Sequence, residues 1–268
     1  TAARSAPSVA GFDATFCAPK SVSILHGLGT PDIRAAVRQA HDVAVREALA
    51  VFESAASRGR RGHGGADVID GDGFVAAAFA HRTSRAGDPH LHTHVVIANL
   101  VHGPDGRWTA LDARPLYHWS KTVGYLYEAE LRHQLTRTVG VEWRTVRRGI
   151  ADVAEVPMQV VDEFSTRRHE IEAHLAENGF DSARSAQLAA YATRRMKDHT
   201  ATPESLVDTW QRRASELGFD CEQVCDRLNA GTLTLRWTGL VHLTPMFGHL
   251  AGPDGLTKTR STFGRREV

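Results

Sequence analysis

The pattern of hydrophobic and polar positions divides the chain into a first half with strands and a second half of helices. Residues 11–17 (GFDATFC) alternate with period two, as a strand with one buried face does. The ranges 74–81 (FVAAAFAH) and 90–100 (HLHTHVVIANL) also predict strands, joined through a Gly-Asp-Pro turn as an antiparallel pair. A short return strand is expected at RWTAL (107–111), and VEWRTV (141–146) is strand-like.

Two long helices are predicted between these strands. Thr30, Pro31 and Asp32 supply a cap, a proline at the first helical position and an acid in the first turn. Behind them an apolar stripe with a stride of three to four runs from Ile33 to Val51. A similar stripe predicts a helix over about 117–138.

The connections around the first helix are expected to be irregular. APKSVS (18–23) predicts a turn, because Pro19 stops the preceding strand. SRGRRGHGG (57–65) is rich in glycine and arginine and predicts a flexible basic loop.

Helices dominate the chain from Pro157 onward. The stride of apolar residues predicts them at about 157–177, 183–198 and 203–217. Strands followed by helices indicate the α+β class. We therefore expect a central antiparallel sheet with helices packed on it, followed by a helical C-terminal part.

Composition indicates a globular protein with no strong overall charge. Of 268 residues, 42% are hydrophobic and 24% charged, which excludes disorder as the class, and the net charge is +1. Three cysteines without a CxxC pair fit a reducing cytosol, and no apolar stretch suits a signal peptide or a membrane span. Any nucleic-acid binding must come from local basic patches: 58–61, 144–148, 193–197 and 258–266.

Four histidines stand around the end of one predicted strand and the start of the next. Since side chains alternate along a strand, His90, His92 and His94 point the same way, with neighbours about 7 Å apart. Antiparallel pairing brings His81 to the same turn, where it can supply a third nitrogen. Three neutral imidazoles leave coordination positions of a divalent metal open, as catalytic sites do. His90 is ambiguous, either exposed beside the turn or a substrate contact.

Asp13 belongs to the polar face of the first strand. Its carboxylate is placed to accept the free N–H of a metal-bound imidazole and so fix the tautomer. It is equally suited to act as a general base.

The blocks GFDATFCAPKSVS, FAHRTSRAGDPHLHTHVVIANL and DGRWTAL, in this order, resemble the relaxase domain of conjugative relaxases of the TrwC/TraI (MobF) type. These belong to the His-hydrophobic-His endonucleases, and the resemblance covers about residues 11–218. It implies a bacterial cytoplasmic enzyme that nicks and rejoins one DNA strand at a plasmid transfer origin. A tyrosine attacks the phosphodiester, which leaves a 5′-phosphotyrosyl link and a free 3′-OH.

The resemblance also implies a site. His81, His92 and His94 hold a divalent metal, Mg²⁺ or Mn²⁺, for which Zn²⁺ or Ni²⁺ can stand in a crystal. Asp13 matches the acid that orients a ligand histidine and helps to deprotonate the tyrosine.

The sequence departs from the family at the nucleophile. In the family a tyrosine-rich stretch precedes the DxTF strand, whereas this sequence has only Tyr117, Tyr125, Tyr127 and Tyr191. Tyr127 lies on an apolar stripe and is expected in the core. We therefore expect that the segment with the nucleophile and the first strand is absent, and that the chain alone forms no covalent adduct.

DNA contacts and domains follow from the resemblance. Residues 1–245 are expected to be the relaxase domain and 246–268 a linker toward a C-terminal helicase region. The expected partners are single-stranded DNA at a transfer origin, relaxosome accessory proteins and coupling proteins. Candidate phosphate contacts are Lys20 and Arg85 beside the histidines, and Arg194, Arg195 and Lys197 on the helical part.

Two other functions remain open on the residues alone. One is a single-stranded DNA-binding module that has lost the nucleophile and does not cleave. The other is a small-molecule metalloenzyme, because paired strand histidines also occur in cupin-like oxygenases. The relaxase-type blocks argue against the latter.

Overall fold

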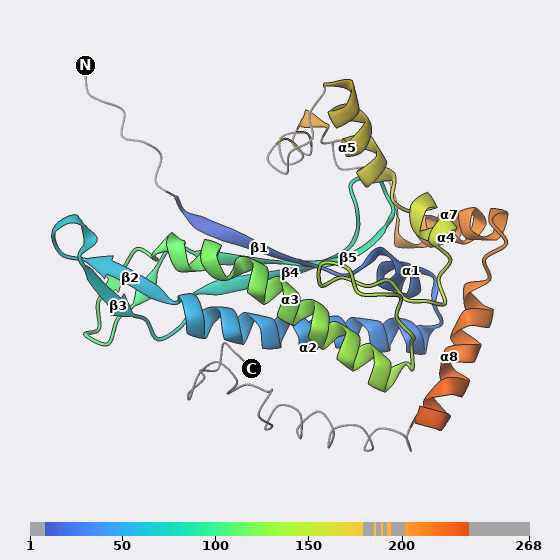
Figure 1. The fold of residues 1–268 in the computed structure, drawn as a ribbon, viewed down its shortest axis with the longest axis horizontal. Helices are drawn as coiled ribbons and strands as arrows, with labels where there is room; N and C mark the ends of the chain where they lie inside the picture. The colour runs from blue at the N-terminus through green and yellow to red at the C-terminus, as the bar shows by residue number, and fades with distance from the viewer. Residues whose placement is uncertain (1–8, 179–184, 186–188, 190–191, 194–201, 236–268) are drawn as a thin grey trace, which may run out of the picture.

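The computed structural model, which describes residues 9–178, 185, 189, 192–193 and 202–235, confirms the α+β class (Figure 1). Its main sheet has the order β1-β5-β4, with both pairs antiparallel. The strands are β1 (Gly11–Cys17), β5 (Pro89–Ala98) and β4 (Ala76–Thr83). Pairing of β4 with β5 was predicted; the central position of β5 puts its histidines next to both neighbours.

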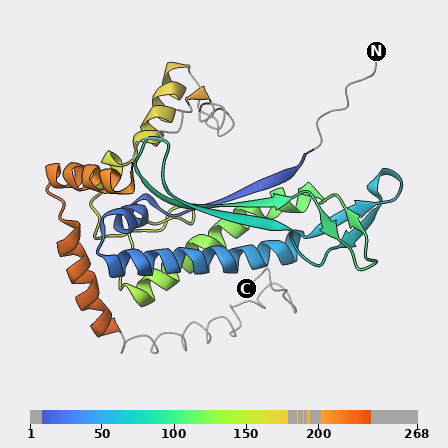
Figure 2. The same cartoon turned by 180° about the vertical axis from the view of Figure 1, so that it is seen from behind.

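Two long helices cover one face of this sheet. Helix α2 (Pro31–Ala56) and helix α3 (Ala113–Thr138) run along it in both views (Figures 1 and 2). Helix α3 begins earlier than predicted, because the Asp112 side chain accepts a hydrogen bond from the Arg114 N–H and caps it. The inward residues of β5 and the apolar stripes of both helices form one continuous core.

The remaining helices gather at the end of the sheet where β4 turns into β5 (Figure 1). They are α1 (Lys20–Leu28), α4 (Met158–Glu163), α5 (Thr166–Glu177), α7 (Pro203–Glu216) and α8 (Cys221–Leu235). Helix α8 was not predicted. All three cysteines are free thiols. Within the described part of the chain, no helix is long and apolar enough to cross a membrane.

Two small ribbons lie at the opposite end. Strand β2 (Arg58–Arg61) pairs with β3 (Asp67–Asp70) around the short 3-10 helix η1 (His63–Gly65). Strand β6 (Val101–His102) pairs with β7 (Trp108–Thr109), which confirms the return strand predicted near Trp108.

Two predicted connections are wrong. Only Ala18 and Pro19 separate β1 from α1, so APKSVS is mostly helix, and Val22, Ile24 and Leu25 of that helix are fully buried. The predicted basic loop at 57–65 instead contains strand β2, followed by the short 3-10 helix η1. Its arginines form ion pairs that offset their charge: Arg58 with Asp70, Arg60 with Asp112 and Arg61 with Asp105.

Two more predicted elements differ from the structure, and two lie mostly or wholly outside the described residues. VEWRTV is not a strand; it contributes one isolated bridge, between Trp143 and Val153. The helix expected over 157–177 is interrupted at Phe164 and Ser165, which separate α4 from α5. Most of the helix expected over 183–198 lies outside the described residues, as does the linker expected at 246–268.

Candidate metal centre

The structure brings His81, His92 and His94 together on one face of the sheet. His81 stands directly opposite His92 across the β4–β5 pair, and His94 follows two positions along β5. The ring centres lie 5.3 Å apart for His81 and His92, 5.5 Å for His81 and His94, and 5.2 Å for His92 and His94. We call this side of the sheet, away from α2 and α3, the open face.

These spacings suit a shared metal ion. With metal–nitrogen bonds of about 2.1 Å, two imidazoles on one ion have ring centres about 5 Å apart. The rings are not yet in ligating orientation, because those of His81 and His92 are stacked with an interplanar angle of 26°. Among the described residues, no three His, Cys, Asp or Glu side chains stand ready around one ion. Binding therefore requires a local adjustment of the rings that keeps the Nδ1 contacts of His92 and His94 described next.

Two of the rings have their Nδ1 atoms already engaged. The Nδ1 of His92 lies 2.9 Å from the His90 carbonyl oxygen, and that of His94 lies 2.9 Å from a carboxylate oxygen of Asp13. Because a carbonyl and a carboxylate only accept, each Nδ1 is a protonated nitrogen, and in the neutral form of each ring it is Nε2 that has the free lone pair. This is the tautomer that metal ligation through Nε2 requires.

Asp13 reaches His94 from the neighbouring strand β1. Thr15, which pairs with His94 in the sheet, donates its hydroxyl to Asp13 at 3.3 Å and lies 3.1 Å from the same Nδ1. The contact stands where the sequence placed Asp13; its role in chemistry stays a prediction.

Burial favours the neutral form of the His90 and His92 imidazoles. It lowers the pKa of His90 to about 3, with a smaller contribution from the nearby His92 and Lys20 charges. Burial likewise lowers the pKa of His92. His90 is half-buried, its ring centre lies 4.5 Å from that of His92, and its carbonyl orients that ring. Of the two alternatives for His90, full exposure beside the turn does not agree with this half-buried position, and a substrate contact stays a prediction.

A buried chain of polar side chains lies beneath the histidines. Sequence reasoning missed it, because its only signal is a lone histidine in an apolar helix. Thr93, between His92 and His94 but facing inward, lies 2.8 Å from Nε2 of His41. The other ring nitrogen of His41 lies 2.8 Å from the Tyr127 hydroxyl. Tyr127 is only 2% exposed, which confirms its predicted place in the core.

Of the predicted DNA contacts, the structure describes Lys20 and Arg85. The Lys20 ammonium donates to the Pro89 carbonyl at 2.8 Å, and burial lowers its pKa. Arg85 is exposed in the turn between β4 and β5. The remaining candidates and one tyrosine lie outside the described residues: Arg194, Arg195, Lys197 and Tyr191.

A cavity of about 450 Å³ follows the outer edge of β1, between this strand and α3. It is lined by Asp13 and Thr15 on one side and by Tyr117 and Leu116 on the other. Tyr117 is 73% exposed. On the open face itself, Phe79 stands opposite His94 and is 52% exposed.

Comparison with known proteins places these features in one family. Residues 1–217 match the family model described as TrwC relaxase. The chain is 36% identical over 219 residues to the multifunctional conjugation protein TraI of Escherichia coli, and 33% identical over 253 residues to that of strain K12. These alignments cover 78% and 91% of this chain but only 12% and 14% of the two relatives.

Solved structures of the conjugative relaxase TrwC share the fold. A copper-bound structure in complex with OriT DNA has 34% identity and a TM-score of 0.73, and the match covers 82% of this chain and 75% of that one. A metal-free complex with OriT DNA has the same identity and TM-score, with 82% and 79% covered. A complex with a 27-mer DNA comprising the recognition hairpin and the cleavage site has 35% identity and a TM-score of 0.70, with 79% and 75% covered.

Proposed function

Because the chain belongs to the TrwC relaxase family, we propose that it is the strand-nicking part of a conjugative relaxase. It would cut and rejoin one DNA strand at a plasmid transfer origin by metal-assisted phosphotyrosyl transesterification. The chain spans about an eighth of the length of the curated relatives it matches, so their activity, DNA and partner proteins come to it as proposals.

The observation that supports this function most strongly is the group of three imidazoles on the open face of the sheet. We assign His81, His92 and His94 as ligands of a divalent ion, Mg²⁺ or Mn²⁺. A bound ion would draw negative charge from the non-bridging phosphate oxygens during nucleophilic attack. Asp13 holds the His94 ring, and the His90 carbonyl holds the His92 ring, so that both present Nε2.

Single-stranded DNA at the transfer origin is the proposed partner. The open face offers Phe79, an exposed aromatic ring beside the histidines, on which a base can stack. Arg85 adds a cation at the adjacent turn. Arg194, Arg195 and Lys197 stay candidates for the backbone path, as do accessory and coupling proteins for the wider assembly.

Nicking tests the proposal directly. The protein, expressed from its full reading frame, is incubated with Mn²⁺ and a supercoiled plasmid that carries its cognate origin. We expect relaxed circles and a protein–DNA adduct on a denaturing gel, both abolished by His92→Ala. The matched control is His133→Ala, an exposed histidine of α3. Nicking that survives His92→Ala or excess chelator would reject the proposed function.

A DNA-binding module without cleavage is the second candidate. It is favoured by the position of the described tyrosines: Tyr127 is in the core, and Tyr117 and Tyr125 lie on α3. The same assay separates the two, because a binding module retards an origin oligonucleotide but yields neither nick nor adduct. Under the primary proposal, Tyr117→Phe leaves nicking intact.

A further inference from the structure

We propose that Lys20, Asp88 and Arg213 are positioning residues that fix the first residues of β5 and thereby set the metal affinity of the histidines behind them. The inference rests on the proposed metal site. It gives Lys20 a role different from the phosphate contact that the sequence predicted.

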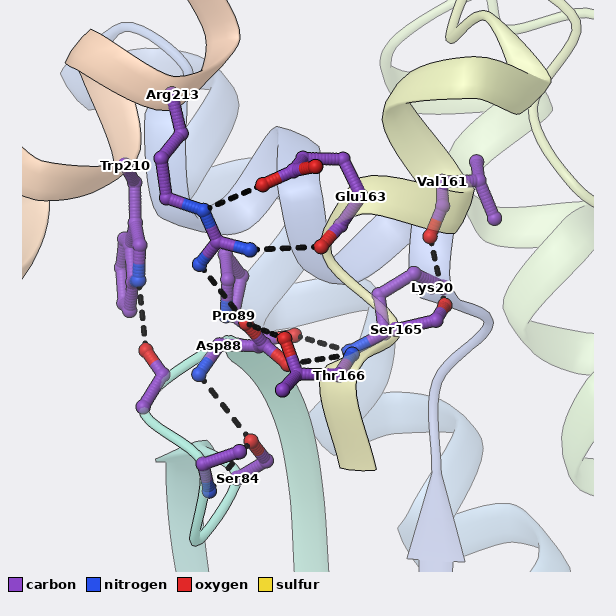
Figure 3. A network of polar contacts seen from close by, with 12 residues as sticks. Lys20, Ser84, Asp88, Pro89, Val161, Glu163, Ser165, Thr166, Trp210 and Arg213 are labelled. Atoms are coloured by element: carbon purple, nitrogen blue, oxygen red, sulfur yellow. Dashed lines mark hydrogen bonds and ion pairs between the residues drawn. The ribbon is translucent and has the colours of Figure 1, made fainter. Parts of the chain in front are cut away.

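Asp88 is the centre of this arrangement (Figure 3). It lies in the turn between β4 and β5, directly before Pro89, and is 0% exposed. Its carboxylate accepts from the Thr166 N–H at 3.0 Å, the Thr166 hydroxyl at 3.1 Å and Nη1 of Arg213 at 3.0 Å. A buried carboxylate with three donors is held rigidly, because losing any one of them leaves a charge poorly compensated.

Helix α7 attaches to the turn at two points. Arg213 joins Asp88 to Glu163, with Nε 2.9 Å from the Glu163 carboxylate and Nη2 2.7 Å from its carbonyl oxygen. One turn earlier along the helix, the Trp210 indole N–H donates to the Gly87 carbonyl at 2.7 Å (Figure 3). The turn is therefore bound to the helical part through both backbone and side chain.

Helix α1 holds the same turn from the other side. The Lys20 ammonium donates to the Pro89 carbonyl at 2.8 Å, and Asp88 and Arg213 are close enough to influence its pKa (Figure 3). Two cations, Lys20 and Arg213, thus face two carboxylates, those of Asp88 and Glu163. The charges balance around Asp88, which is fully buried, while the Glu163 side chain is 41% exposed at the outer side of the cluster.

The position of this cluster in the chain gives it a consequence for the metal site. Pro89 is followed by His90, whose carbonyl orients the His92 ring, and His92 pairs with His81. A shift at Pro89 therefore moves both the ring orientation of one ligand and its pairing with another. Loss of such supporting contacts typically weakens metal binding by about tenfold or more.

The test measures Mn²⁺ binding by titration calorimetry without DNA. Lys20→Met keeps the aliphatic stem, removes the donor of the Pro89 carbonyl and leaves Asp88 its three hydrogen-bond donors, so it should fold; Arg213→Met removes the second tie. We expect each to weaken Mn²⁺ binding by about tenfold. Matched controls are Lys121→Met and Arg212→Met, which change exposed side chains and should leave Mn²⁺ affinity unchanged.

A second titration separates positioning from DNA contact. Binding of an origin oligonucleotide is measured in chelator, where the metal makes no contribution. If Lys20 is a positioning residue, Lys20→Met leaves the DNA affinity unchanged. If Lys20 contacts a phosphate, Lys20→Met weakens DNA binding and leaves the Mn²⁺ affinity unchanged. If the wild-type protein binds Mn²⁺ and Lys20→Met binds it equally well, the positioning role is overturned while the metal site stands. Wild-type protein that binds no Mn²⁺ overturns the metal site with it.

Discussion

The two faces of β5 show how one strand serves two purposes. Leu91, Val95 and Ile97 point toward α2 and α3 and are at most 1% exposed. His92 and His94 alternate with them, point the other way and are half-buried. The inward face is specified by hydrophobic packing, which any well-shaped apolar residues satisfy. The outward histidines contribute little to packing, so their presence calls for a chemical explanation.

Substitutions at two adjacent residues, Leu91 and His92, should have the largest and most different effects. Leu91→Ala should destabilise the protein by about 2–5 kcal/mol, because it opens a cavity in the core, while the folded fraction keeps its Mn²⁺ affinity. His92→Ala should abolish Mn²⁺ binding and change stability by less than about 1 kcal/mol. Thermal melts and calorimetric titrations of both variants measure the two effects. If His92→Ala unfolds the protein as Leu91→Ala does, the outward face is structural too.

The inward face of β5 packs against a buried histidine, His41 of α2. Its effect on the free energy of unfolding depends on pH. Burial lowers the pKa of His41 from about 6.5 in the unfolded chain to about 4 in the folded protein. The unfolded chain therefore binds the proton more tightly. Stability is full above pH 6.5 and falls as pH drops toward 4, by on the order of 3 kcal/mol for this group.

Urea unfolding across this pH range measures the slope. Burial also lowers the pKa of His26 to about 4, so this residue contributes to the slope in the same pH range. A substitution of His41 is therefore needed to isolate the contribution of His41. His41→Gln should reduce the slope, and His133→Gln on the exposed side of α3 should leave it unchanged. An unaltered slope in His41→Gln would contradict the assignment.

On the outward face, Asp13→Asn should weaken Mn²⁺ binding by about 10–100-fold, because the amide no longer holds the protonated Nδ1 of His94 as a carboxylate does. The side chain is half exposed to solvent, so stability should change little. Calorimetry on this variant is compared with Asp42→Asn, an exposed carboxylate of α2. Equal Mn²⁺ affinity for Asp13→Asn and wild type would remove Asp13 from the site.

The effect of removing the exposed aromatic residue on the open face should be confined to DNA binding. Phe79→Ala should weaken binding of single-stranded DNA by about 1–3 kcal/mol, the contribution of one stacked base. Mn²⁺ affinity and stability should stay close to wild type, since the ring is largely exposed. Fluorescence anisotropy with an origin oligonucleotide gives the answer. Unchanged DNA affinity would mean that the strand does not cross Phe79.

The sequence predicted the period-two elements well and the charged ones poorly. Strands β1 and β5 combine alternation with apolar residues, so packing and local pattern agree, whereas β4 was recognised as an apolar run although its residues are largely exposed. Helix α1 was missed because Pro19, Lys20 and Ser21 suggest a turn, although Val22, Ile24 and Leu25 after them are buried. Strand β2 was missed because it is built from arginines and a glycine, and its partners Asp105 and Asp112 are distant in the chain.

The candidate site divides in the same way. His81, His92, His94 and Asp13 could be grouped from strand alternation, because the sheet converts sequence spacing into distance. The attachment of Asp88 to Thr166 and Arg213 could not, since those partners lie 78 and 125 residues away and no local pattern links them. Lys20 was placed near the correct turn, but its contact with the Pro89 carbonyl depends on a helix that the sequence did not reveal.

The most direct measurement is anomalous diffraction from a crystal of this protein soaked in Mn²⁺. The proposed metal site predicts one strong peak on the open face, within about 2.3 Å of Nε2 of His81, His92 and His94, with Asp13 still on Nδ1 of His94. A crystal with no peak between these rings, or with the ion enclosed by protein on every side, would contradict it.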